Sequence, residues 1–246
     1  MRVKTIVPVT TERFIEPTKQ EAERYASKRT EIDVEALNYG TASIESAYDE
    51  LLCAPDILRI VQEAESNEFD GIFIDCMGDP ALDASRELVK IPVVGPARTS
   101  ILFAADLAEK FSIVTILENV LRVERNLAKL AGVSDKLASV RSVDIPVLEL
   151  EERKKLMNAL VEESVKALEE DNAQAIILGC TGMMEVAKDL QDSLTERGFE
   201  VPVINPVAVA IKHLESLISL NLSQSKRAYM HPPEKERNLF EKLPGE

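Results

Sequence analysis

The feature that most constrains the fold is a short unit that occurs twice in the chain. Each copy is an apolar run followed by a cysteine, any one residue and a glycine, and then by a stretch of helical composition. The first copy spans residues 71–80 (GIFIDCMGDP) and the second spans residues 175–184 (AIILGCTGMM). After each copy a second apolar run, IPVVGP at 91–96 and VPVINP at 201–206, leads into a further helical stretch. A repeated unit of two strands and two helices predicts two half-domains related by pseudo-symmetry.

Strands and helices alternate along most of the chain, which is typical of an α/β fold with parallel sheets. Further strands are expected at 3–7, 32–37, 112–117 and 136–143, and further helices at 16–28, 118–130 and 151–170. With 246 residues the chain can form two pseudo-symmetric lobes, each a parallel sheet flanked by helices. The expected bounds are 1–108 with 206–222 for the first lobe, 109–205 for the second, and 223–246 for a C-terminal extension in which the apolar periodicity fails.

One stretch of the first half contains a proline between two helical segments. Residues 40–43 are expected to form a turn in which Ser43 caps a helix over 44–52, and Pro55 is expected to end that helix before another begins at 56. Cys53 lies at the apolar end of the first segment. A small buried side chain is the favoured interpretation of Cys53, in preference to a catalytic role.

Charge and cysteine content narrow the partners and the compartment. The chain has 43 acidic and 29 basic residues, and a net charge of -14 argues against nucleic acid or an anionic membrane as a partner. No apolar stretch approaches the roughly 20 residues that span a bilayer, and no signal peptide is evident. Three cysteines do not make a disulfide framework, so reduced thiols are expected. We therefore expect a cytoplasmic protein, a homo-oligomer, that acts on a small-molecule substrate.

The two repeated cysteines, Cys76 and Cys180, are the candidate catalytic residues. If each thiol lies where a strand ends and a helix begins, the helix dipole and the free backbone N–H groups lower its pKa. The glycine two positions further on lets a substrate approach those N–H groups, which can hold an oxyanion. One thiolate could then remove a proton from a carbon beside a carbonyl, while the other thiol returns a proton to the opposite face. The result is inversion of a stereocentre.

Other side chains near the repeated units and at strand ends are candidates for substrate binding. They are Pro8, Thr10, Ser43, Gly78, Asp79, Thr115, Thr181 and Gly182. For Asp79 the alternative is a charge that favours a helix N-terminus, and for Thr181 it is a helix cap. The only histidines are His213 and His231, which are too few to complete a zinc site, and no Cys-x-x-Cys or Gly-rich nucleotide motif is present. We expect neither a metal nor an organic cofactor.

These motifs resemble a known family. Residues 69–82, 91–95 and 177–183, together with 41–50 and 111–115, are similar to the hydantoin and allantoin racemase branch of the aspartate/glutamate racemase superfamily. The resemblance extends from residue 1 to about residue 220. It implies two pseudo-symmetric α/β lobes with the active site between them, and it places the two catalytic cysteines of the family at Cys76 and Cys180.

The residues around the cysteines bear on the substrate class. Amino-acid racemases of the superfamily typically carry Asn-Thr after the first cysteine and Cys-Thr-His at the second, whereas this chain has Met77-Gly78 and Thr181-Gly182. Without histidine assistance, a cyclic ureide with a neutral carbonyl is an easier substrate than a free amino acid. Hydantoin racemases usually carry Asn-Pro-Asn-Thr after the first strand, and residues 7–10 here read Val-Pro-Val-Thr, which indicates a less polar ligand.

Several alternatives remain open at this point. The same lobes occur in aspartate and glutamate racemases, in maleate isomerases, where a thiol adds to a double bond, and in arylmalonate decarboxylases, which need only the second cysteine. A non-catalytic small-molecule sensor is a further alternative. The presence of both cysteines favours a racemase over a decarboxylase, and two exposed thiols would be a liability in a sensor.

Overall fold

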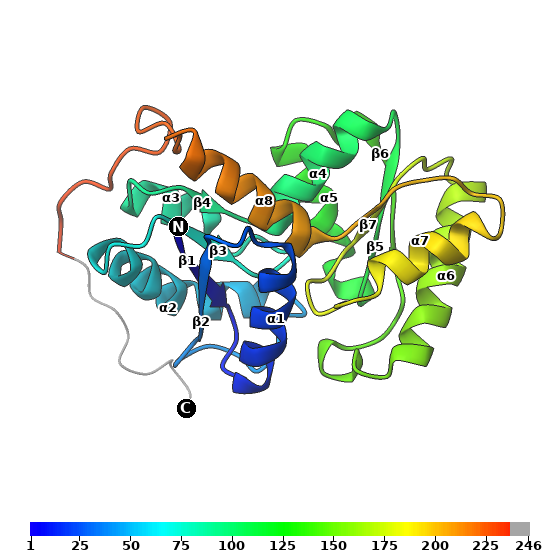
Figure 1. The fold of residues 1–246 in the computed structure, drawn as a ribbon, viewed down its shortest axis with the longest axis horizontal. Helices are drawn as coiled ribbons and strands as arrows, with labels where there is room; N and C mark the ends of the chain where they lie inside the picture. The colour runs from blue at the N-terminus through cyan, green and yellow to red at the C-terminus, as the bar shows by residue number, and fades with distance from the viewer. Residues whose placement is uncertain (237–246) are drawn as a thin grey trace.

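The described part of the chain forms two four-stranded parallel sheets (Figure 1). The structure is a computed structural model, and it describes residues 1–236. The first sheet has the order β2-β1-β3-β4 and the second the order β6-β5-β7-β8. The strands are β1 (Arg2–Val7), β2 (Glu31–Ala36), β3 (Gly71–Ile74), β4 (Val93–Val94), β5 (Phe111–Thr115), β6 (Leu137–Ser142), β7 (Ile176–Leu178) and β8 (Val203–Ile204). The predicted fold of two similar α/β lobes is therefore confirmed.

An α-helix follows each strand, so both halves have the same order of elements. The helices are α1 (Ile15–Tyr25), α2 (Ala47–Ser66), α3 (Leu82–Leu88), α4 (Pro96–Leu107), α5 (Leu121–Leu130), α6 (Arg153–Glu169), α7 (Ala187–Thr195) and α8 (Pro206–Ser219). Short 3-10 helices lie at Glu12–Phe14, Glu118–Val120, Ser134–Lys136 and Val147–Glu149. None of the described helices is long and apolar enough to cross a membrane.

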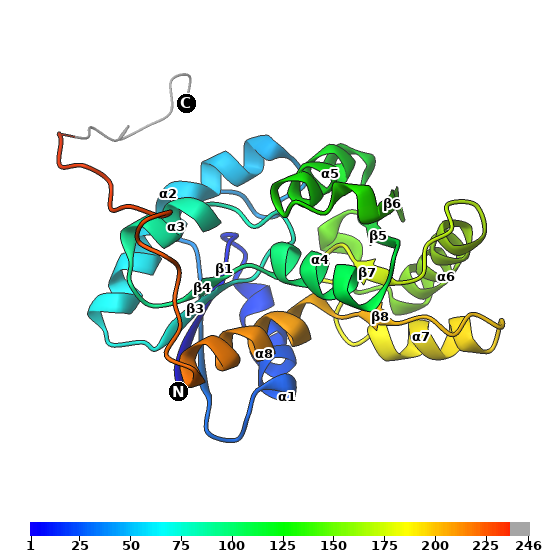
Figure 2. The ribbon, with the colours of Figure 1, turned by 90° about the horizontal axis from the view of Figure 1, so that it is seen from above.

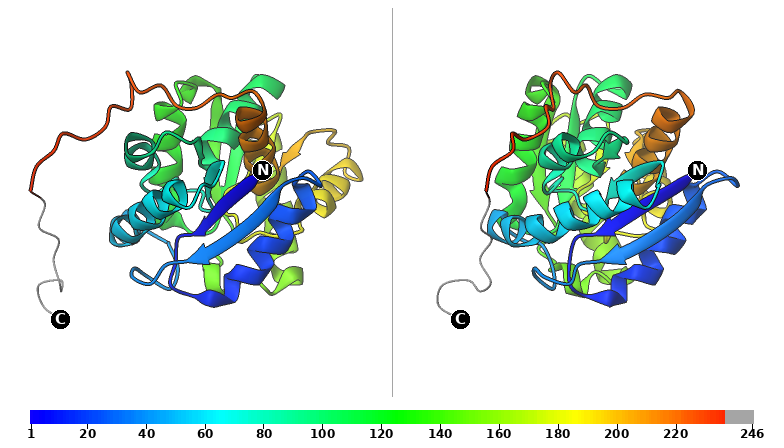
Figure 3. Two further views of the ribbon diagram at one scale, coloured as in Figure 1. Left: turned by 60° about the vertical axis from the view of Figure 1, so that its left-hand side comes forward. Right: turned by 90° about the vertical axis from the view of Figure 1, so that its left-hand side faces the viewer.

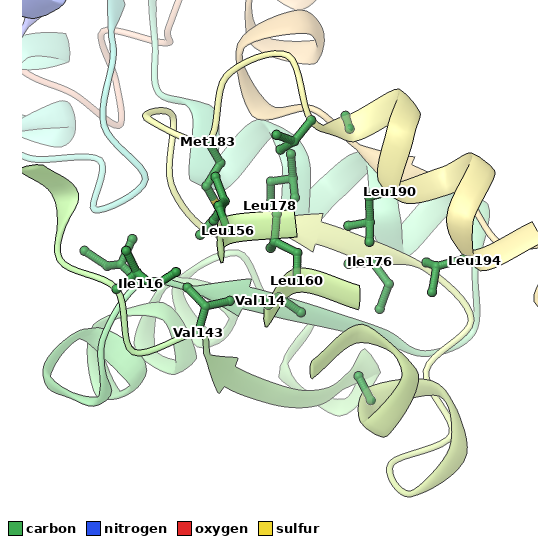
Figure 4. Close-up of a cluster of buried hydrophobic side chains, with 14 of the residues drawn as sticks. Val114, Ile116, Val143, Leu156, Leu160, Ile176, Leu178, Met183, Leu190 and Leu194 are labelled. Atoms are coloured by element: carbon green, nitrogen blue, oxygen red, sulfur yellow. The ribbon is translucent and has the colours of Figure 1, made fainter. Parts of the chain in front are cut away.

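The two faces of the second sheet bury alternate residues of the same strands. On one face Val114 and Ile176 pack against Leu160 of α6 and Leu190 of α7, and the labelled side chains of Figure 4 converge there. On the other face lie Phe111, Ile113 and Ile177. Burial on both faces explains why these strands read as continuous apolar runs and not as an alternating pattern.

The last helix of each half packs on the sheet of the other half. α4 follows β4, yet its buried residues Ala97, Ile101 and Ala104 belong to the core around β5 and β7. α8 follows β8, yet Val207, Ala210, Ile211 and Leu214 pack in the core around β1, β3 and β4. A Cβ on Gly71 would come within 2.8 Å of Leu214 Cδ1, so a glycine in β3 lets α8 lie close to the first sheet.

This exchange places α4 and α8 side by side between the lobes (Figures 1 and 2). The predicted lobe bounds stay a prediction. Because α4 packs on the second sheet, we propose that the boundary lies at Gly95, ahead of α4, and that the second lobe comprises residues 96–205.

The segment around Pro55 differs from the prediction. α2 is one continuous helix with Pro55 inside it, and its N-cap is Ser46, whose side chain accepts a hydrogen bond from the Asp49 backbone N–H. The predicted cap at Ser43 and the predicted break at Pro55 are therefore wrong. Residues on both sides of the proline, among them Cys53 and Ile57, are fully buried in the first lobe, and this burial offsets the hydrogen bond that proline removes. The burial of Cys53 confirms the favoured interpretation.

The start of the C-terminal extension lies on the first lobe. The Gln224 side chain donates hydrogen bonds to the carbonyls of Val89 and Ile91 at 2.9 and 2.8 Å, and it accepts one from the Val93 N–H at 3.3 Å. One side-chain amide thus forms hydrogen bonds with the backbone at the outer edge of β4. Figure 3 shows the segment leaving α8 and running along the outside of this lobe. Residues 237–246 of the predicted extension lie outside the described residues.

Candidate active site

The two repeated cysteines occupy equivalent positions in the two lobes. Cys76 is the second residue after β3, and Cys180 is the second residue after β7. Both strands hold the same place in their sheets, next to β1 and β5 respectively. Both cysteines line one cavity whose walls come from the two lobes. The structure therefore brings together the two residues that the repeat singled out.

A tight turn follows each cysteine. The Asp79 N–H donates to the Cys76 carbonyl at 3.0 Å, and the Met183 N–H donates to the Cys180 carbonyl at 3.1 Å. The prediction that a helix begins at each cysteine is wrong, because α3 begins only at Leu82 and α7 only at Ala187. Positive φ angles at Asp79, Ala81 and Glu185 keep the intervening backbone out of a right-handed helix.

The prediction of a lowered thiol pKa is also wrong. Burial raises the pKa of the Cys76 thiol well above its ordinary value and raises the pKa of Cys180 to about 12. The N–H groups of Gly78 and Gly182 oppose this effect, and the Gly78 N–H lies 3.5 Å from the Cys76 sulfur. With no helix starting at either thiol, these N–H groups do not compensate for burial.

Three carboxyl groups line the cavity beside the thiols. Asp75 precedes Cys76, Glu50 comes from the first turn of α2, and Glu124 comes from α5. Burial is the largest cause that raises the pKa of each: to about 6 for Asp75, to about 7 for Glu50, and well above the ordinary value for Glu124. Among the described residues that line the cavity, none is a lysine, an arginine or a histidine. The site is therefore acidic and contains no cation of its own.

Two of these carboxyl groups have an oxygen without a hydrogen-bond partner among the described residues. Asp75 Oδ2 accepts a hydrogen bond from the Thr18 hydroxyl at 3.0 Å, and Asp75 Oδ1 has no partner. Glu124 Oε1 lies 3.4 Å from the Thr115 hydroxyl, and Glu124 Oε2 has no partner. Buried polar atoms are normally paired, so these oxygens are the natural contacts for polar groups of a ligand.

The predicted binding residues separate into two groups. Pro8, Gly78, Thr115, Thr181 and Gly182 line the cavity together with the cysteines. The Thr181 hydroxyl donates to the Asp75 carbonyl at 3.2 Å, which links the two lobes at the site. The alternative that Thr181 caps a helix is wrong, because α7 starts at Ala187 without a side-chain cap.

Thr10, Ser43 and Asp79 do not line this cavity. The Thr10 N–H donates to the Thr41 carbonyl at 2.9 Å, and the Ser43 carbonyl accepts from the Thr41 hydroxyl at 2.7 Å. The Asp79 carboxylate accepts hydrogen bonds from the N–H groups of Ala97 and Arg98 at 3.0 and 2.8 Å. Asp79 therefore caps the N-terminus of α4. The sequence predicts a role at a helix N-terminus as the alternative to substrate binding, but at the helix that follows Cys76.

Two acidic residues of the cavity were not predicted as site residues. Glu50 and Glu124 are far from both cysteines in the sequence, and acidic residues in helices are ordinarily exposed. A weak signal exists for Glu124, since it lies one helical turn from Leu127, a buried apolar residue of α5. In residues 1–236, no group of three or more histidine, cysteine, aspartate or glutamate side chains is placed to hold a metal ion.

Comparisons with known proteins agree with this geometry. A family model described as Asp/Glu/Hydantoin racemase matches residues 3–214. A hydantoin racemase of Pseudomonas sp. (strain NS671) is 36% identical over 238 residues, which cover 96% of this chain and 94% of that protein. The structure of an allantoin racemase from Klebsiella pneumoniae is 36% identical with a TM-score of 0.89, covering 97% of this chain and 96% of that one. An allantoin racemase from Pseudomonas fluorescens is 32% identical with the same TM-score, covering 97% and 100%. The chain therefore belongs to the Asp/Glu/hydantoin racemase family.

Proposed function

We propose that the protein is a cofactor-independent racemase that inverts a carbon centre beside the carbonyl of a ureide, with 5-substituted hydantoins as its substrates. The observation that carries the proposal is the pair of thiols, Cys76 and Cys180, which come from opposite lobes and line one cavity. Membership of a family that includes hydantoin and allantoin racemases supports it.

In the proposed mechanism the two cysteines share one proton between them. One thiolate removes the C5 proton of the hydantoin, and the electrons of the C–H bond move onto the neighbouring carbonyl oxygen. The opposite thiol then donates its proton to the other face of C5. For the other enantiomer the roles of the cysteines are reversed. No net proton is consumed, and the acid and base are both side chains.

The charge of the cavity favours a neutral substrate. Amino acids, maleate and arylmalonates carry carboxylates, which need a cation or a strong set of donors, and the described lining offers carboxyl groups instead. A hydantoin ring presents two N–H donors and no charge. Asp75, whose pKa of about 6 leaves it mostly ionised at pH 7, has a free oxygen that can accept one of these N–H groups.

The rest of the wall indicates the nature of the 5-substituent. Apolar side chains dominate it, including Val7, Val9, Phe14, Ile44 and Val147. A hydrocarbon substituent would bury its surface against these residues, whereas the polar ureido substituent of allantoin would lose hydrogen bonds to water. We therefore propose 5-alkyl or 5-benzyl hydantoins ahead of allantoin.

The test is to incubate the pure protein with single enantiomers of 5-isobutylhydantoin, 5-benzylhydantoin and allantoin in D₂O. Optical rotation and deuterium at C5 are followed together, with aspartate, glutamate and maleate as competing candidates. We expect rotation to decay and deuterium to enter the alkyl and benzyl hydantoins faster than allantoin. Turnover of aspartate, glutamate or maleate with inert hydantoins would contradict the proposal.

We further propose that the enzyme acts in the cytoplasm and as a homo-oligomer. Three free cysteines suit a reducing compartment.

Exposed apolar side chains on α4 suit a contact between copies of the chain. The exposed fractions are 48% for Leu102, 40% for Phe103 and 59% for Leu107. Light scattering of the pure protein measures the mass, and a monomer would contradict the oligomer.

A further inference from the structure

Glu124 is a carboxyl group in an unusual position. α5 places it on the wall of the cavity that contains both thiols, where only 3% of its surface is exposed. In the described part of the chain no ion pair neutralises it. Burial raises its pKa well above the ordinary value, and the nearby charges of Asp79 and Glu50 act in the same direction. These effects favour the protonated form of the Glu124 carboxyl group.

Its hydrogen bonds inside the protein are incomplete. The Thr115 hydroxyl has a single hydrogen and lies near two acceptors, the Gly179 carbonyl at 2.9 Å and Glu124 Oε1 at 3.4 Å. Because the hydrogen goes to the closer Gly179 carbonyl, Thr115 donates at most a weak hydrogen bond to Glu124. Glu124 Oε2 is buried and has no partner among the described residues. A proton on Oε2 has no acceptor among the described residues, and a group that enters the cavity can accept it.

The proposed reaction creates such a group. When a thiolate removes the C5 proton, negative charge develops on the carbonyl oxygen at the adjacent C4, and a donor aimed at that oxygen stabilises the transition state. Glu124 lies near enough to Cys180 for the titrations of the two groups to influence each other. A carboxylic acid kept neutral at pH 7 by an apolar site is an effective donor to an enolate oxygen.

Building on the proposed function, we propose that Glu124 is a further catalytic residue, whose neutral carboxyl group donates a hydrogen bond to the enolate oxygen of the ureide. The C5–H bond breaks and its proton goes to the thiolate, while the C4=C5 double bond forms and the π electrons of the C4 carbonyl move onto its oxygen. Glu124 keeps its proton throughout. When the opposite thiol protonates C5, the electron pair returns and the hydrogen bond to Glu124 weakens.

The test compares Glu124→Gln with Glu124→Leu and Glu124→Met, with Glu118→Leu as an exposed control on the preceding turn. Racemisation of 5-benzylhydantoin by the unchanged protein is measured first, so that failure of the proposed function is seen before any variant is interpreted. Glutamine keeps an N–H donor in the same place, whereas leucine and methionine fill the space without one. Methionine provides a second apolar variant in case leucine prevents folding, and urea unfolding checks each protein.

We expect kcat of Glu124→Leu and Glu124→Met to fall about 100- to 1,000-fold, the usual effect of removing one oxyanion donor, with little change in KM. Glu124→Gln should retain kcat within about tenfold of the unchanged enzyme, because its amide still donates a hydrogen bond. Glu118→Leu should behave as the unchanged enzyme. The proposal is overturned if a folded apolar variant keeps kcat within threefold, or if Glu124→Gln is as inactive as the apolar variants.

Discussion

At the scale of single residues, the cysteines could be predicted and the carboxyl groups around them could not. Cys76 and Cys180 are marked by the repeat, because the same short pattern occurs around both. Glu50 and Glu124 carry no such mark, since only the folded chain shows that α2 and α5 turn them toward the thiols. The predicted lowering of the thiol pKa values is wrong for the same reason. The burial and the neighbouring carboxyl groups that raise these pKa values exist only in the assembled cavity.

The first prediction concerns the influence of Glu50 on Cys76. Apart from burial, the charge of Glu50 is the largest cause that raises the pKa of the Cys76 thiol, and Glu50 has a pKa of about 7. Glu50→Gln removes the charge that is present above this pH. The pKa of Cys76 should therefore fall, and the rise of kcat/KM with pH should move to lower pH for the enantiomer that Cys76 deprotonates.

The pH profile of kcat/KM for each hydantoin enantiomer measures this shift, with Glu63→Gln as the control. Glu63 lies on the same helix but pairs with Arg59 at the surface. A profile of Glu50→Gln that is unchanged, or displaced to higher pH, would disprove the coupling between Glu50 and Cys76.

At the scale of elements, the sequence predicts most strands and helices but not the turns that join them to the site. Short apolar runs gave the positions of β1, β3, β5 and β7, because parallel strands are buried on both faces. The sequence predicts a helix directly after each cysteine, but positive φ angles at Asp79 and Ala81 delay α3, and one at Glu185 delays α7. The continuity of α2 through Pro55 depends on tertiary burial, which a local pattern does not contain.

Asp79 provides a prediction at this scale. Its carboxylate accepts the hydrogen bonds of two N–H groups at the start of α4, so it joins the turn after Cys76 to a helix of the second lobe's core. Asp79→Ala leaves those N–H groups without partners and should lower the free energy of unfolding by about 1 to 2 kcal/mol. Because Asp79 does not line the cavity, KM for hydantoin should change little.

Urea unfolding and steady-state kinetics measure the two effects side by side, and Asp83→Ala is the control. Asp83 is an exposed residue of α3 that pairs with Arg98. If Asp79→Ala left stability unchanged and raised KM strongly, Asp79 would be a substrate contact, as the sequence also allowed.

At the scale of the whole molecule, the sequence predicts the pseudo-symmetry and assigns residues 206–222 to the first lobe, but it does not predict that α4 packs on the second sheet. Each helix follows its own half in the chain and completes the core of the other. A repeat in the sequence gives the order of elements and contains no information on which sheet a terminal helix covers. The exchange fixes the lobes against each other, and with them the two thiols.

Buried acids in the cavity and at the start of α4 lead to a prediction about overall stability. Asp75 and Asp79 have a pKa of about 6 and Glu50 of about 7 in the folded protein, above their ordinary values of 3.8 and 4.5. The folded state therefore binds more protons than the unfolded state between about pH 4 and pH 7, and the free energy of unfolding should fall as pH rises through this window.

Carboxylates with lowered pKa values change the free energy of unfolding mainly at a pH below this window. Glu215, with a pKa of about 2, contributes stability that is lost only as pH falls below its ordinary value of 4.5. Urea unfolding midpoints at about pH 5, 6 and 7 measure how the free energy of unfolding changes with pH. A urea midpoint that rises steadily from pH 5 to pH 7 would contradict the prediction, because it would show that ionisation of these carboxyl groups does not destabilise the folded state.

The proposed two-base mechanism requires that two thiols from opposite lobes act on opposite faces of one substrate. Its most direct test is deuterium exchange by Cys76→Ser and Cys180→Ser with each enantiomer of 5-benzylhydantoin in D₂O, corrected for exchange in buffer alone. Serine conserves shape but is a far weaker base than a thiolate. We predict that neither variant racemises the substrate and that each exchanges the C5 proton of one enantiomer only, the two variants acting on opposite enantiomers. Racemisation near the rate of the unchanged enzyme in either variant would contradict the two-base mechanism.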